Sequence, residues 1–225
     1  MDSSFLKGSL FYGLNLQKAI NHDMIYFVKF HDKILCTVFG ISILVLLILY
    51  KIVLGNQNKG LNLTCVEQKV WETVWTIFPA IILLFLAFPS LKLLYKLDGN
   101  WVFDSPLVKV KVVGRQWYWS YEIKDLNFDS FMIPSKELNV GDLRLLEVDR
   151  PLFLPRLNIL QFFITSRDVI HCFSLPSFGV KCDAVPARLN KIYLDCYWVG
   201  SFYGQCSEIC GANHRFMPIV LEIIK

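Results

Sequence analysis

The sequence contains few charged residues for a chain of its length. Charged side chains make up 19% of the 225 residues, and the net charge is only +4. Because this small excess is spread along the chain, we expect no basic surface of the kind that binds nucleic acid. The length also excludes a large multi-domain enzyme and argues against a polytopic transporter.

No cleavable targeting segment is expected at the start of the sequence either. Residues 1–30 show no short apolar core with a small-residue cleavage site, and they contain Asp2 and Asp23 but no arginine. This differs from both secretory signals and transit peptides. We therefore expect that the first membrane span is itself the signal, or that the chain is made in the compartment where it inserts.

Apolar residues, by contrast, are abundant at 54% of the chain. Ile34–Tyr50 and Thr73–Leu91 are free of charge, and with their apolar flanks each is long enough to cross a hydrocarbon core of about 30 Å as a helix. Pro79 and Pro89 lie in the second run, where a membrane helix tolerates proline if a neighbouring helix packs against it. We predict two spans, at about 34–54 and 73–94.

Three parts are therefore expected: an N-terminal segment (1–33), a transmembrane helical hairpin (34–96) and a water-facing domain (97–225). From Leu107 onward apolar and polar residues alternate, which is typical of strands. Candidate strands are Leu107–Ile123, Leu143–Val148, Ile159–Thr165, Val169–Phe173, Lys191–Val199 and Met217–Ile224. This pattern predicts an all-β sandwich or Greek-key barrel anchored by the hairpin.

The seven cysteines are odd in number, so some thiols must be free, bound to metal or paired outside the chain. Two of them belong to a short segment that carries Cys206, Cys210, His214 and Met217. Thiolate, thioether and imidazole ligands together favour copper before zinc, and a closed structural zinc site has no use for methionine. The other cysteines are interpreted as small apolar residues: Cys36, Cys65, Cys172, Cys182 and Cys196.

The second cysteine distinguishes this pattern from a mononuclear blue-copper site, which uses one Cys, two His and a weak axial Met. Two thiolates four residues apart can bridge two copper ions, each with its own histidine. His171 is then the one candidate for the second histidine in the β domain, since His22 and His31 precede the first span. A Cys206–Cys210 disulfide is the alternative.

Several motifs carry a family resemblance. They are Trp71–Pro79, Gly114–Glu122, Gly141–Asp149, Asp168–His171, Pro186–Asn190, and Tyr203–Gly211 continuing to Met217–Pro218. With these motifs the chain resembles subunit 2 of the haem-copper cytochrome c oxidases. That resemblance implies a cupredoxin-like Greek-key domain that holds a dinuclear copper centre, CuA, and that is anchored by a two-helix transmembrane hairpin.

The resemblance also implies residue roles. His171, Cys206, Cys210, His214 and Met217, with the backbone carbonyl of Glu208, would bind two copper ions. The Glu208 side chain would bind a magnesium ion shared with subunit 1. Electrons from cytochrome c would enter at Trp117, and the docking face would include Glu122, Asp149 and Asp168. Glu72 would assist proton uptake toward subunit 1.

The implied function is that of an oxidase subunit with no oxygen reduction of its own. It would accept electrons from reduced cytochrome c and pass them to the haem of subunit 1, for oxygen reduction coupled to proton pumping. Its partners would be subunit 1, other oxidase subunits, cytochrome c and the lipid membrane. The β domain would face the intermembrane space from the mitochondrial inner membrane, or the outside of a bacterial plasma membrane.

Two other functions share part of this pattern. A quinol-oxidase subunit would have the hairpin and β domain without the copper ligands, and a membrane-tethered copper chaperone would not need the Trp117 cluster or the Glu72 motif. One departure from the family concerns backbone conformation, because Pro186-Ala187 stands in place of a usual Pro-Gly. The turn at Ala187 is therefore expected to avoid conformations that only glycine adopts easily.

Overall fold

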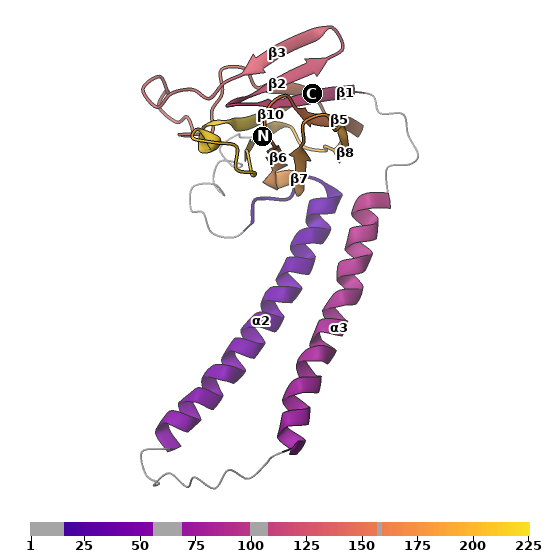
Figure 1. Cartoon of the computed structure of the whole chain (residues 1–225), viewed down its shortest axis with the longest axis vertical. Helices are drawn as coiled ribbons and strands as arrows, with labels where there is room; N and C mark the ends of the chain where they lie inside the picture. Colours follow the sequence, from indigo (N-terminus) through magenta and orange to yellow (C-terminus); the bar gives the residue numbers. More distant parts are fainter. Residues whose placement is uncertain (1–15, 56–68, 100–107, 157–158) are drawn as a thin grey trace. The chain divides into compact units, whose positions relative to one another are not determined.

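The chain, in a computed structural model, is described over residues 16–55, 69–99, 108–156 and 159–225 (Figure 1). It divides into two compact units. One unit contains the β strands together with the chain up to Ile25, and the other runs from Tyr26 to Gly99. The boundaries expected from the sequence at 33 and 96 remain a prediction, and the structure groups the residues before Tyr26 with the β domain.

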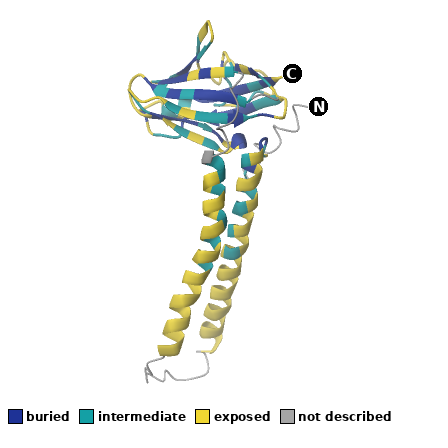
Figure 2. Cartoon of the chain, turned by 90° about the vertical axis from the view of Figure 1, so that its right-hand side faces the viewer, coloured by how far each residue is buried: buried dark blue, intermediate teal, exposed yellow. Residues whose placement is uncertain are grey.

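Two long helices contain the apolar runs. Helix α2 spans His22–Gly55 and α3 spans Lys69–Gly99, so both extend beyond the predicted spans. Pro79 and Pro89 lie inside α3 without ending it. Most apolar side chains of both helices are exposed (Figure 2), and an apolar surface of this extent requires lipid or protein around it. Both helices are long and apolar enough to cross a membrane.

Within the helical unit, only a narrow stripe of each helix is partly covered. The partly buried side chains recur every three or four residues, as expected for one face of a helix. On α2 they include Phe30, Ile34 and Thr37, and on α3 they include Ile82, Leu86, Pro89 and Leu93. The remaining faces of both helices are open to other molecules.

The β domain contains three sheets in the part of the chain that the structure describes. Their strand orders are β3-β2-β1-β5-β8, β4-β10-β9 and β6-β7. Strand β1 pairs antiparallel with β2 and parallel with β5. The strands are β1 Val108–Arg115, β2 Tyr118–Ile123, β3 Leu126–Ser130, β4 Leu152–Pro155, β5 Ile159–Ser166, β6 His171–Leu175, β7 Val180–Ala184, β8 Asn190–Asp195, β9 Gly200–Gln205 and β10 Pro218–Ile224.

One apolar face of the large sheet forms the core. In β5, Leu160, Phe162 and Ile164 are fully buried and alternate with less buried positions, as the two-residue period of a strand requires. They pack in one cluster with residues of the neighbouring strands and of the smaller sheets. These include Val110, Val112, Trp119, Tyr121, Phe173, Leu175, Phe202, Ile219 and Leu221. The all-β fold class predicted from the sequence is confirmed.

Several predicted strands differ from the structure. The described part of the predicted strand Leu107–Ile123, from Val108 onward, is a hairpin rather than one strand, because the chain turns at Gln116 and Trp117. The predicted strand at Leu143–Val148 is wrong. This segment forms turns in which the Glu147 side chain accepts a hydrogen bond from the Leu143 amide, so the backbone finds its partner locally.

Other boundaries shift. The predicted strand Lys191–Val199 ends at Asp195 in the structure. Trp198 therefore lies beyond the strand and is half exposed. Four short strands were not predicted, namely β3, β4, β7 and β9. Each is only four to six residues long, and such short segments give weak periodic signals.

The segment before α2 packs on the β domain. The Asn21 side-chain oxygen accepts a hydrogen bond from the Met24 amide at 2.8 Å, which caps the helix, while its Nδ2 donates to the Phe178 carbonyl at 3.1 Å. Ile20 is buried, and its amide donates to the Ser177 carbonyl. The first turn of α2 is therefore fixed to the loop between β6 and β7.

The turn at Ala187 corrects one expectation. Its φ of 61° lies in the left-handed region that the sequence was expected to avoid. For a residue with a Cβ this conformation costs about 1–2 kcal/mol. The strain is held in place where Pro186 forms a bridge to Ser166 and the Arg188 amide bonds to the Val185 carbonyl.

We predict that Ala187→Gly stabilises the β domain by about 0.5 kcal/mol. The substitution removes the left-handed strain but adds about 0.4–1 kcal/mol of unfolded-chain entropy. Thermal unfolding of the full chain in detergent, followed by near-ultraviolet circular dichroism, measures the change. Ala184→Gly, in the buried strand β7, is the matched control and should lower the melting temperature. A lower melting temperature for Ala187→Gly would contradict the assignment of strain.

Candidate metal centre

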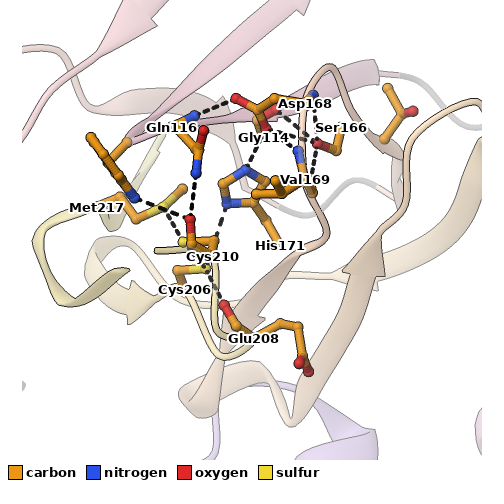
Figure 3. A network of polar contacts seen from close by, with 12 residues as sticks. Gly114, Gln116, Ser166, Asp168, Val169, His171, Cys206, Glu208, Cys210 and Met217 are labelled. Atoms are coloured by element: carbon orange, nitrogen blue, oxygen red, sulfur yellow. Dashed lines mark hydrogen bonds and ion pairs between the residues drawn. The ribbon is translucent and has the colours of Figure 1, made fainter. Parts of the chain in front are cut away.

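The candidate ligands come from two places in the β domain. His171 is the first residue of β6, and Cys206 and Cys210 lie in the connection that follows β9. His214 opens the short helix η2, His214–Phe216, and Met217 follows it directly before β10. A strand end and one loop must therefore meet to complete the site, and Figure 3 shows that they do.

Backbone contacts hold the loop against β6. Gly204 in β9 lies so close to the Ser174 carbonyl of β6 that a Cβ at this position would overlap that oxygen. Two residues after β9 ends, the Ser207 amide donates a 3.1 Å hydrogen bond to the Cys172 carbonyl. Glycine is thus required at 204 for the two strands to approach, and this approach sets the position of Cys206.

The donor atoms converge on one buried point. The two cysteine Sγ atoms are 3.9 Å apart, far beyond the S–S bond of about 2.05 Å, so Cys206 and Cys210 are free thiols here. The ligand atoms of His171, Cys206 and Cys210 all lie within 4.8 Å of one another. All three residues are buried.

Each cysteine has its own imidazole and its own weaker donor. Cys206 Sγ lies 3.9 Å from His171 Nδ1 and 3.3 Å from the Glu208 carbonyl oxygen. Cys210 Sγ lies 3.5 Å from His214 Nδ1 and 3.6 Å from Met217 Sδ. The cluster therefore contains two similar halves joined by the two sulfurs.

This donor set fits copper. Two ligands bound at about 2.0–2.3 Å to one tetrahedral ion lie about 3.5 Å apart, and the donor separations of 3.3–3.9 Å are close to that value. Thiolates, a thioether and imidazoles together are the soft and intermediate ligands that copper prefers. The repeated half-site of sulfur, imidazole and weak donor matches two ions better than one.

Asp168 orients the His171 ring. Its carboxylate lies 2.8 Å from His171 Nε2, which leaves Nδ1 directed at Cys206. The same carboxylate accepts hydrogen bonds from the backbone amides of Gln116 and Val169. Gly114 leaves room for the ring, because a Cβ there would lie 2.9 Å from His171 Cδ2. This is the carboxylate–histidine arrangement that fixes a metal ligand's tautomer.

Burial and hydrogen bonds shift the pKa values of these groups in opposite directions. Burial raises the pKa of the Cys206 thiol, but hydrogen bonds with His171 and the backbone outweigh it, so the net pKa is lowered. Burial and the neighbouring Cys206 raise the pKa of Cys210. Without a cation the pair thus favours a single thiolate, and a bound cation that takes both sulfurs must displace a proton.

Trp117 connects the metal loop to the surface. It lies in the turn between β1 and β2, is partly exposed, and its Nε1 donates a 3.2 Å hydrogen bond to the Cys210 carbonyl. Gln116 Nε2 donates to the same oxygen at 2.7 Å. Gly211 packs against the Trp117 ring, since a Cβ there would lie 3.1 Å from its Cζ2.

The remaining predicted residues lie away from the sulfurs. The Glu208 side chain points away from them, so only its backbone carbonyl belongs to the cluster (Figure 3). Glu122 forms a 2.9 Å ion pair with Lys111, and the exposed Asp149 accepts a hydrogen bond from the Phe131 amide. Glu72 lies in the first turn of α3, in the other unit.

Sequence reasoning missed the residues that support the ligands. Gln116 and Ser166 carry no metal-binding signal, yet Gln116 holds the Cys210 carbonyl and the Ser166 hydroxyl contacts Asp168. The resemblance assigned Asp168 to the docking face for cytochrome c and not to the support of the His171 ring. Its position three residues before a candidate ligand was the one available signal.

A β domain that holds this cluster and is carried on two apolar helices defines a membrane-anchored, cupredoxin-like metal protein. A family model described as the periplasmic domain of cytochrome c oxidase subunit II matches residues 108–224, and one for its transmembrane domain matches residues 9–93. The chain therefore belongs to the cytochrome c oxidase subunit II family, as subunit II of a haem-copper oxidase.

The chain is also similar to solved structures. The periplasmic domain of subunit II of cytochrome oxidase from Bradyrhizobium japonicum is 42% identical, with a TM-score of 0.50, and the match covers 54% of this chain and 87% of that one. A second match, 39% identical with a TM-score of 0.48, is a mixed disulfide intermediate between a thioredoxin-like protein and subunit II of cytochrome c oxidase. It covers 56% of this chain and 88% of the other.

We predict that Asp168→Ala weakens copper binding by about 10–100-fold, the usual cost of losing the partner that orients a ligating histidine. Competition with a copper chelator, on the full chain in detergent, measures the affinity. Asp149→Ala removes another exposed acid that was assigned to docking but does not contact a ligand, so it should leave the affinity unchanged. Equal affinities for the two variants would show that Asp168 does not position His171.

Proposed function

We propose that this chain relays electrons from reduced cytochrome c to the haem of subunit 1, where oxygen is reduced and protons are pumped. The observation that supports this proposal most directly is the convergence of His171, Cys206, Cys210 and His214 with two weaker donors in one buried cluster. A quinol-oxidase subunit would have no use for this cluster.

In this proposal six groups hold two copper ions: the side chains of His171, Cys206, Cys210, His214 and Met217 and the carbonyl of Glu208. Bound copper supplies reversible one-electron transfer. The protein excludes water from the sulfurs, because both cysteines and Met217 are buried. Asp168 and Gly114 keep the His171 ring in place, so the ligands need little rearrangement when the charge of the site changes.

Trp117 is the proposed point at which electrons enter. It is the partly exposed aromatic residue that hydrogen-bonds the metal loop directly, whereas Trp119 is buried and contacts Met217 and His171 from inside. An acidic surface would speed the encounter with a basic partner and make its rate sensitive to salt. Of the proposed docking acids, Glu122 is partly neutralised by Lys111 and Asp149 is exposed.

Three further roles follow from family membership. The Glu208 side chain is free of the sulfur cluster and would bind magnesium together with subunit 1. Glu72, in the first turn of α3, would serve proton uptake toward that subunit, because a carboxylate beside a membrane span is costly without a role. The β domain would face the intermembrane space of mitochondria, or the outer side of a bacterial plasma membrane.

The copper content tests the proposed cofactor. We expect the full chain in detergent to bind two copper ions that share one unpaired electron, as seen by metal analysis and electron paramagnetic resonance. Cys206→Ser should abolish the shared-electron spectrum, and Cys172→Ser, which changes a buried cysteine of β6 outside the ligand set, should retain it. A single copper with a mononuclear spectrum would instead support a chaperone or storage role.

The route through Trp117 has its own test. In the assembled oxidase, Trp117→Leu should slow electron transfer from reduced cytochrome c, because it removes the aromatic ring that links the surface to the Cys210 carbonyl. Copper content should be unchanged. Trp198→Leu, at an exposed tryptophan outside the metal loop, is the matched control. A normal rate in Trp117→Leu would rule out this route.

A further inference from the structure

A groove between the two membrane helices carries four lysines. The groove forms a cavity of about 510 Å³ lined by Lys29 and Lys33 on α2 and by Lys92 and Lys96 on α3. Tyr26 and Phe30 also line it. All of these residues belong to the helical unit. No part of the proposed electron relay uses them.

The spacing places the four amines at one level of the hairpin. Lys29 and Lys33, like Lys92 and Lys96, are four residues apart and so lie on one face of their helix. The charge-free run of α2 begins directly after Lys33, and that of α3 ends directly before Lys92. The groove therefore lies where hydrocarbon gives way to lipid headgroups, a depth at which lysine extends its amine toward the interface.

Two of the four amines lie near one aromatic ring, and the described residues show no ion pair that balances them. Lys96 Nζ lies 3.1 Å and Lys29 Nζ 5.9 Å from the centre of the Tyr26 ring. Within the described parts of the chain, none of the four lysines forms an ion pair, and the nearby Asp32 pairs with His31. Like charges this close repel one another unless an anion lies among them.

We propose that this groove binds the phosphate headgroup of an anionic phospholipid. The four amines supply positive charge and N–H donors for a phosphodiester anion, and Tyr26 adds a hydroxyl at the interface. Phe30, Pro89 and Leu93 extend the lining with apolar surface that suits the first carbons of the acyl chains. On the matrix or cytoplasmic side of membranes, basic pockets between helices bind such headgroups, and the same attraction between opposite charges acts at either face. The proposal is independent of the copper site.

The test compares two pairs of substitutions in the full chain. Lys29→Gln with Lys92→Gln removes one charge from each helix of the groove, and Lys51→Gln with Lys69→Gln makes the same change at the opposite ends of α2 and α3. Lysine and glutamine have similar helix propensities, so both variants should fold. Nanodiscs of phosphatidylcholine with increasing fractions of phosphatidylglycerol present the lipid, and native mass spectrometry counts the molecules retained.

We expect the unsubstituted chain to retain phosphatidylglycerol selectively. The groove variant should lose this preference by about 25-fold, at about fivefold for each lysine near a charged headgroup, and the opposite-end variant should keep it. Equal losses in both variants, or none in either, would overturn the proposal. So would displacement of the lipid by dissolved inorganic phosphate. Unchanged lipid retention with weaker binding to the large oxidase subunit would assign the groove to an acidic segment of that subunit instead.

Discussion

The close approach of β6 and β9 is the contact on which the metal centre depends. Because residue 204 has no side chain, β9 can lie against the Ser174 carbonyl of β6, and the loop that follows then bonds to Cys172 through Ser207. These contacts bring Cys206 within 3.9 Å of His171, although 35 residues separate them in sequence. A wider separation of the strands would leave Cys206, Cys210, His214 and Met217 together in their loop but without His171.

The burial of two neighbouring sulfurs explains the polar network around the cluster. Two cysteine sulfurs 3.9 Å apart in a buried position cannot both carry a charge at low cost without a cation. The opposite pKa shifts of Cys206 and Cys210 express this conflict. Asp168, Gln116 and Trp117 act on the surrounding groups instead of on the sulfurs. They fix the His171 ring and the Cys210 carbonyl, so the ligands are held in place before a metal binds.

The sequence allowed a loop rich in metal-binding side chains and the two helices to be predicted, because both depend on local composition, and the role of those side chains as copper ligands stays a prediction. Cys206, Cys210, His214 and Met217 lie within twelve residues, and the charge-free runs mark the helices. Features that depend on tertiary contacts were missed. The β1–β2 turn at Gln116 and Trp117 was hidden because strand-favouring aromatic residues begin within it, from Trp117 to Trp119. The interaction of Asp168 with His171, and the left-handed Ala187, need the packed strands to become visible.

The two units reach stability by different means, and this determines how the chain can work. The β domain buries a continuous core of its own, so its ligands are positioned by internal packing. The helices bury almost none of their apolar surface, and in a bilayer no hydrophobic effect drives them against each other. Their open faces must be covered by lipid or by other subunits. The ligands are held by the packing of the β domain, and the helices that carry it are covered by lipid or by other subunits. This arrangement suits a subunit that holds an electron carrier for a larger membrane complex.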